Sequence, residues 1–311
     1  MQIAQSPAGA IDGLVDYPTE RRYLNVDSDD GQTIRVHVVE AGPADGRPIV
    51  FLHGNPAWSY IWRHAMAAAA AAGYRAIAVD HVGSGMSDKP TAIDDYSVAD
   101  HVAWQRSVLF DQLDVRDAIF VLHDWGGIIG LRLLAEQPDR IAGVAISNTG
   151  LPWRDPIEPL PEDCSARGPF ADFQAMARVA PVWEPWSLLR MVMGTEPSAE
   201  VVAGYRAPYP DADLTIGSRA FTQLLPTRPD NPMLPDNFEA WKVLDQFEKP
   251  FVTIFSDQDV VAPTGYKELQ ARIPGAHGQP HVILEGGGHL LQEDLPEDYS
   301  QTLIDWIVTV Q

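Results

Sequence analysis

An aspartate stands where a predicted strand gives way to a predicted helix. Residues 118–122 are apolar, Asp124 follows two residues later, and a helical pattern continues through Leu134. A strand-to-helix turn of this kind presents the side chain at its apex above a sheet, beside the N-terminus of a helix. Gly126 supplies the small residue that the turn needs after its apex, whereas Leu122 replaces the small residue that usually precedes it. Asp124 is therefore a candidate nucleophile, and capping of the following helix is its structural alternative.

Two residues near the C-terminal end of the chain could assist such a nucleophile. His289 comes after the glycines at 286–288, where a flexible turn could direct an imidazole toward Asp124, and Asp259 follows the preceding apolar run. An acid that binds the Nδ1 proton of a histidine orients the ring and leaves Nε2 to act as a base. We therefore predict a relay of Asp124, His289 and Asp259, with Asp257 as the competing acid.

An aspartate nucleophile restricts the chemistry more than a serine would. A serine that displaces a leaving group from a saturated carbon leaves an ether, which water does not readily cleave. A carboxylate leaves an ester, and a histidine-activated water can hydrolyse it. We therefore predict that Asp124 attacks an sp³ carbon and that His289 activates the water. The backbone N–H groups of Asn55 and Trp125 are the predicted donors to the oxyanion.

Short apolar runs alternate with helical patterns, which is typical of a mostly parallel sheet flanked by helices. The predicted strands are residues 33–39, 49–52, 76–79, 118–122, 144–146, 251–255 and 282–284. Residues 97–113 predict a helix with Ser97 as its N-cap, and Pro296 opens a closing helix. Residues 150–230 are rich in Pro and Trp and show no clear strand pattern. We therefore predict an α/β core over residues 1–149 and 231–311, with a helical cap inserted over 150–230.

Composition and charge exclude several classes of partner. Acidic residues outnumber basic ones by 43 to 22, and the net charge of −21 repels phosphate backbones and anionic lipid surfaces. The single cysteine, Cys164, can form neither an intramolecular disulfide nor a cysteine-rich metal site. Gly278 and Pro280 separate His277 from His281, so these two do not share a helical face, and we predict no metal site. No nucleic acid or membrane partner is expected.

The distribution of apolar residues predicts a cytoplasmic protein. The first residues lack the basic start and apolar stretch of a signal peptide, and no later run approaches the roughly 18 apolar residues that span a bilayer.

Several motifs together resemble the haloalkane dehalogenases. They are HGNPAWSYIWR at 53–63, DHVGSGMSDKP at 80–90, HDWGG at 123–127, GYRAPYPD at 204–211 and HLLQED at 289–294, and the resemblance covers nearly the whole chain. HGxP alone marks only a broad superfamily, but the Asn followed by WSYxWR is more specific. The resemblance implies the α/β-hydrolase fold with an inserted helical cap. It also implies a small neutral haloalkane as substrate, water as co-substrate, halide as product and no cofactor.

The resemblance also implies how the halide is bound. In the family, one donor is the Trp after the nucleophile and the second is either an Asn after HG or a Trp from the cap, which makes Trp125 and Asn55 the pair here. The cap position of that Trp is occupied by Phe173, which cannot donate a hydrogen bond, so the second donor must be Asn55. Some relatives place the triad acid where this chain has Asn148, and this departure favours Asp259.

Three other functions remain open on the sequence. Epoxide hydrolases share the Asp nucleophile and use two cap tyrosines as acids, for which Tyr205 and Tyr209 are the candidates. Residues 257–261 fit the DxDx[TV] pattern of phospho-aspartate phosphatases, although few residues follow to complete such a site. A non-catalytic protein that holds a small apolar ligand is the fourth interpretation.

Overall fold

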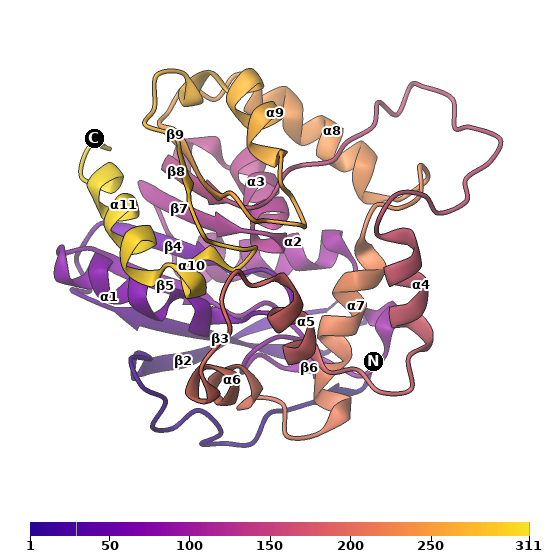
Figure 1. Ribbon diagram of the computed structural model, residues 1–311, viewed down its shortest axis with the longest axis horizontal. Helices are drawn as coiled ribbons and strands as arrows, with labels where there is room; N and C mark the ends of the chain where they lie inside the picture. The colour runs from indigo at the N-terminus through magenta and orange to yellow at the C-terminus, as the bar shows by residue number, and fades with distance from the viewer. Residues whose placement is uncertain (29, 311) are drawn as a thin grey trace.

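An eight-stranded sheet forms the centre of the computed structural model, which describes residues 1–28 and 30–310 (Figure 1). Its spatial order is β10 (Val282–Leu284), β9 (Phe251–Ser256), β8 (Ile141–Ser147), β7 (Ala118–His123), β4 (Pro48–Leu52), β5 (Arg75–Val79), β3 (Thr33–Ala41) and β2 (Glu20–Asp27). Only β3 runs antiparallel to its neighbours. A separate two-stranded ribbon pairs β1 (Ile3–Ala4) with β6 (Lys89–Pro90). The predicted mostly parallel sheet is confirmed.

Helices cover both faces of the sheet because its strands are apolar on both sides. In β4, Ile49 and Phe51 belong to one core cluster, whereas Val50 and Leu52 belong to the other. The first cluster is completed by α1 (Arg63–Ala71) and α11 (Pro296–Ile307). The second is completed by α2 (Val98–Arg106), α3 (Trp125–Glu136), α8 (Met233–Leu244) and α9 (Gly265–Arg272). Strands buried on both faces read as continuous apolar runs, which is why the sequence reveals them.

The predicted elements match the observed ones with two differences. Each predicted strand is present, and Ser97 caps α2 by accepting a hydrogen bond from the Asp100 backbone N–H at 3.0 Å. The predicted single helix over 97–113 is wrong in its second half, since α2 ends at Arg106 and a π-helical turn covers Ser107–Gln112. Strand β2 was not predicted, because it lies at the sheet edge with mostly exposed side chains and lacks the apolar alternation of a half-buried strand.

The segment over residues 150–230 lies outside the sheet. It contains α4 (Ala171–Val179), α5 (Pro185–Val192), α6 (Ala199–Arg206) and α7 (Ile216–Leu224), and no strand occurs within these residues. In Figure 1 these helices lie to one side of the sheet, whereas the closing helices α10 (Leu291–Asp294) and α11 return to it. The assignment of 150–230 as a cap stays a prediction. Among the described residues no helix combines the length and apolarity needed to cross a bilayer.

Candidate active site

Asp124 occupies a strained turn between β7 and α3. Its backbone has φ 50° and ψ −121°, a conformation that costs free energy for a residue with a side chain. Glycine is required after Asp124 in the turn and on the neighbouring loop after β4: a Cβ on Gly126 would lie 2.1 Å from the Leu52 carbonyl oxygen, and one on Gly54 would lie 2.3 Å from Asp124 Oδ1. The Asp124 side chain makes no hydrogen bond that caps α3. The capping alternative therefore does not describe this residue.

Leu122 is accommodated by a glycine in the helix that follows the turn. The Leu122 side chain is fully buried, and a Cβ on Gly130 of α3 would lie 2.4 Å from its Cδ2. Strand and helix can therefore pack closely even though the small residue has moved from the strand to the helix. This exchange explains how the turn forms without the usual glycine before the nucleophile.

The structure brings the three predicted relay residues together. His289 Nδ1 lies 2.9 Å from Asp259 Oδ1, and His289 Nε2 lies 3.4 Å from Asp124 Oδ2. The other carboxylate oxygen, Asp124 Oδ1, accepts a hydrogen bond from the Asn55 backbone N–H at 2.8 Å. Asp257, the competing acid, is exposed and instead accepts a bond from the Gly286 N–H.

The two carboxylates change the protonation of the imidazole between them. Burial lowers the pKa of His289, but hydrogen bonds and charge from Asp124 and Asp259 outweigh it and raise the pKa to about 9. Burial raises the pKa of Asp124 and of Asp259, yet the interaction with His289 holds both below their ordinary value. The two carboxylates therefore favour the imidazolium form of His289.

This arrangement predicts a pH-dependent stability. A histidine whose pKa is raised in the folded state contributes its full stabilisation of the folded protein at a pH below its unfolded pKa of 6.5. This contribution is lost as the pH rises toward 9. The free energy of unfolding of the wild type, relative to that of His289→Gln, should therefore fall across this window in urea titrations. The comparison cancels the opposite contribution of Lys89, whose pKa burial lowers to about 7. A constant difference would contradict the raised pKa.

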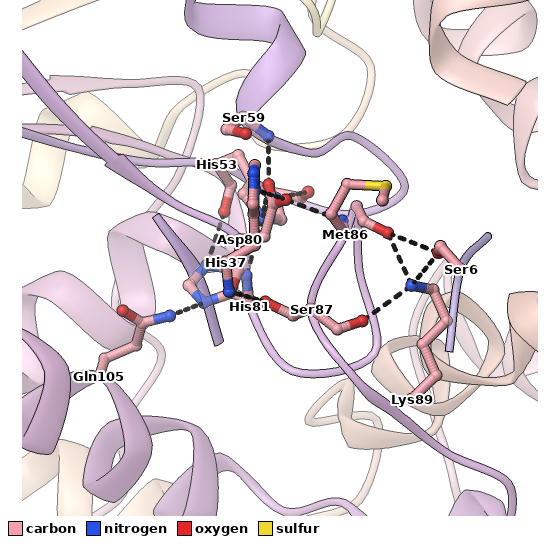
Figure 2. Close-up of polar contacts among 12 residues, drawn as sticks. Ser6, His37, His53, Ser59, Asp80, His81, Met86, Ser87, Lys89 and Gln105 are labelled. Carbon is pink, nitrogen blue, oxygen red and sulfur yellow. Dashed lines mark hydrogen bonds and ion pairs between the residues drawn. The ribbon is translucent and has the colours of Figure 1, made fainter. Parts of the chain in front are cut away.

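A buried histidine network holds the loop that carries Asn55 (Figure 2). His53 Nδ1 donates to the Gly54 carbonyl at 2.8 Å, and its Nε2 accepts from the His81 N–H at 3.0 Å. His81 Nε2 donates to the His53 carbonyl, and its Nδ1 accepts from Gln105. Burial lowers the pKa of both histidines, which keeps them neutral in these roles. The network therefore aims the Asn55 N–H at the nucleophile.

A cavity of about 270 Å³ opens onto Asp124. Its walls are almost entirely apolar, and the lining residues are Asn55, Pro56, Asp124, Trp125, Pro169, Phe170, Phe173, Leu188, Met191, Val192, Thr222, Leu225, Val260, Val261 and His289. Met191 and Val260 line it while remaining 75% and 69% exposed, so they lie at its mouth. Most of these wall residues were missed by sequence reasoning. Only Val260 and Val261 carried a signal, as an apolar pair directly after Asp259.

The predicted halide donors and Phe173, which lies in the predicted cap, all line this cavity. Asn55 has a buried side-chain oxygen without a hydrogen-bond partner among the described residues, and the Trp125 ring packs on Phe221 at 5.4 Å between centroids. Buried polar atoms without partners are uncommon in proteins and often mark functional sites.

Tyr205 and Tyr209, the two candidate tyrosines of the 150–230 segment, lie elsewhere. The Tyr205 hydroxyl donates to Glu293 Oε2 at 2.9 Å, and the Tyr209 hydroxyl accepts from the Gly85 N–H at 2.6 Å. Neither residue lines the cavity. Asn148, on the loop after β8, donates to the His289 carbonyl at 2.9 Å and so supports the backbone of the histidine.

No group of side chains suited to a metal ion occurs among the described residues. His281 accepts from the Thr253 N–H and donates to the Ala276 carbonyl, so both ring nitrogens have structural partners.

A mostly parallel sheet with a nucleophile turn after one strand and an acid and a histidine after later ones defines the α/β-hydrolase class, and the α/β hydrolase family model matches residues 47–188. The haloalkane dehalogenase of Psychrobacter cryohalolentis is 40% identical over 99% of this chain and 98% of its own length. That of Mycolicibacterium paratuberculosis is 38% identical over 98% of both chains. This chain belongs to the haloalkane dehalogenase family.

Solved structures agree on the fold. The haloalkane dehalogenase of Paraglaciecola agarilytica superposes with a TM-score of 0.85 at 22% identity, covering 97% of each chain. The enzyme from Agrobacterium tumefaciens gives 0.76 at 25% identity, covering 98% of this chain and 100% of its own.

Proposed function

We propose that this protein hydrolyses neutral haloalkanes to an alcohol and a halide through a covalent ester on Asp124. One observation carries the proposal: an ionised carboxylate projects into an apolar cavity, held by the Asn55 N–H on one oxygen and facing His289 with the other. Apolar walls solvate a carboxylate less well than bulk water does, which favours its attack on a carbon.

The first step needs no proton transfer. Asp124 Oδ2 forms a bond to the substrate carbon, while the carbon–halogen bond breaks and its electron pair leaves with the halide. Strain at the nucleophile turn helps here, because the side chain is already aimed and loses little freedom in reaching the transition state.

The second step follows from the loss of charge on Asp124. Esterification removes one of the two carboxylates that raise the pKa of His289, so the imidazolium loses its proton to solvent more readily, and this proton balances the charge of the released halide. Neutral His289 then takes a proton from water as that water attacks the Asp124 carboxyl carbon. The oxyanion forms at the oxygen that faces the Asn55 N–H, and collapse of the intermediate releases the alcohol with a proton from His289.

The departing halide is stabilised by the side chains of Trp125 and Asn55, since Phe173 offers no donor in the cap wall. Replacement of Asn55 by Ala should slow bromide formation by about tenfold, because one donor to developing charge is lost while the backbone N–H remains. Rapid-mix measurement of the bromide burst checks this. An unchanged bromide burst in Asn55→Ala would mean that a residue other than Asn55 is the second halide donor.

The wall also favours neutral substrates. Asp124 and His289 are the only ionisable residues among those that line the cavity, and no Arg or Lys is present to pair with a substrate carboxylate. An uncharged haloalkane of modest length matches both the volume and the chemistry.

A single-turnover reaction in ¹⁸O-labelled water tests the ester. With enzyme in excess over 1-bromobutane, the label should enter the Asp124 carboxyl group, since water attacks the protein carbon and the alcohol keeps an aspartate oxygen. Mass analysis of the peptide and of the butanol distinguishes the outcomes. Label in the first-turnover alcohol would overturn the covalent route.

A parallel assay with 1,2-epoxybutane separates this function from epoxide hydrolysis. The hydroxyls of Tyr205 and Tyr209 bond to groups away from the cavity, so neither is placed to protonate an epoxide oxygen. Bromide release without diol formation is the expected result.

A further inference from the structure

The carboxylate of Asp294 joins two segments that lie about a hundred residues apart in the chain. Asp294 Oδ2 accepts hydrogen bonds from the Gly194 N–H and the Gly288 N–H, both at 2.8 Å. Asp294 Oδ1 accepts from the Thr195 N–H at 2.9 Å and from its hydroxyl at 2.6 Å. Gly194 and Thr195 are separated by one residue from the end of α5, which lines the cavity, and Gly288 directly precedes His289.

The two segments also touch through their backbones. The His289 N–H donates to the Val192 carbonyl at 2.7 Å. A Cβ on Gly288 would lie 2.4 Å from the Gly194 nitrogen, and one on Gly194 would lie 2.6 Å from the Gly286 carbonyl oxygen. The glycines before His289 therefore allow close packing against the segment after α5.

The other polar contacts of the His289 backbone are made by the core. Its carbonyl oxygen accepts bonds from Asn148 Nδ2 at 2.9 Å and from His123 Nε2 at 2.8 Å. The core thus anchors the carbonyl side of this residue, whereas Val192 and Asp294 anchor its N–H side. The position of the ring depends on both.

We infer that Asp294 is a positioning residue that couples the segment after α5 to the base, and this inference rests on the proposed ester mechanism. Asp294 contacts neither Asp124 nor the halide donors. Its loss should therefore leave ester formation largely intact and slow ester hydrolysis, which requires His289 to be correctly aimed at water.

The chain offers a matched control. Asp257 also accepts a hydrogen bond from the same glycine turn, at the Gly286 N–H, but it is exposed and reaches no residue of the 150–230 segment. Asp294→Asn keeps the size of the side chain while one of its two acceptors becomes a donor. At least one backbone N–H bond is therefore lost, and two are lost if the amide nitrogen faces Gly194 and Gly288, since the Thr195 hydroxyl can accept as well as donate. Thr195→Val removes only the hydroxyl bond and provides a milder second variant.

The experiment is rapid-mix bromide release from 1-bromobutane, followed in parallel by intact-protein mass. For Asp294→Asn we expect a burst within about twofold of the wild type, a steady-state rate lowered about tenfold or more, and accumulated alkyl ester. Thr195→Val should change in the same direction by less, and Asp257→Asn should match the wild type. Thermal unfolding establishes that each variant is folded.

The outcomes distinguish a failure of this inference from a failure of the proposed ester mechanism on which it rests. Asp294 does not act through His289 if Asp294→Asn and Thr195→Val lower the rate of the bromide burst and the steady-state rate by the same factor. The same conclusion holds if both rates are unchanged in these variants. If no ester appears even in His289→Gln, the covalent mechanism itself fails. Ester that accumulates in His289→Gln but in neither of the other two variants would overturn the positioning role alone.

Discussion

Replacement of Asp124 by Asn is expected to lower bromide release from a bromoalkane by roughly a thousandfold or more, because the variant loses the carboxylate that we propose as the nucleophile. An amide carries no negative charge and attacks a saturated carbon poorly. The amide can still accept the Asn55 N–H bond through its oxygen, so the loop should keep its geometry. The change therefore removes nucleophilicity rather than structure.

The measurement is bromide release with enzyme in excess, so that even one turnover is visible. An amide at residue 124 resembles the ester in that water activated by His289 could hydrolyse it and restore the aspartate. Asp124→Ala excludes such recovery and should stay inactive on prolonged incubation. Bromide release by either variant at more than a tenth of the wild-type rate would refute the role of Asp124.

Chain order and strand ends account for how much of the site could be predicted. Asp124, Asp259 and His289 each follow a strand of the sheet, and the carboxyl ends of parallel strands meet at one edge. This places the three residues near one another without any knowledge of distances. Strand ends alone do not distinguish Asp259 from Asp257, because the two residues lie only two positions apart after the same strand. The local conformation of the turn determines which of the two carboxylates faces the imidazole.

The cavity and the contacts behind His289 depend on long-range packing. The wall residues Met191 and Val192 belong to α5, whose apolar stripe predicts burial but not the partner against which it packs. The four bonds of Asp294 close a loop of about a hundred residues, and no local pattern distinguishes it from its acidic neighbour Glu293. The contact of Leu122 differs from these, because both partners lie close together in the chain. The glycine that accommodates Leu122 is Gly130, only eight residues later, although its role becomes clear only from the contact in the structure.

His289→Gln is expected to release about one equivalent of bromide and then stop, with Asp124 left as an alkyl ester. Attack on carbon needs only the carboxylate, whereas hydrolysis of the ester needs a base that the amide of Gln cannot supply. The variant therefore separates the two steps of the proposed mechanism. Intact-protein mass should increase by one alkyl group, and peptide mapping should place the increase on Asp124.

The pH of this experiment matters because His289 also stabilises the charge of Asp124. Burial raises the pKa of the carboxyl group, and the interaction that holds it below its ordinary value is lost with the histidine. The burst in the variant should therefore weaken as the pH falls through a range in which the wild type still reacts, and a pH of about 8 should keep Asp124 ionised.

The double variant His289→Gln, Asp124→Ala is the control for the adduct, since it retains the cavity walls but has no carboxylate at residue 124. It should release no bromide and gain no mass. Continued turnover by His289→Gln would mean that another group activates the water. An adduct that persists in the double variant would place the reactive carboxylate elsewhere, and the strained turn at Asp124 would then need another explanation.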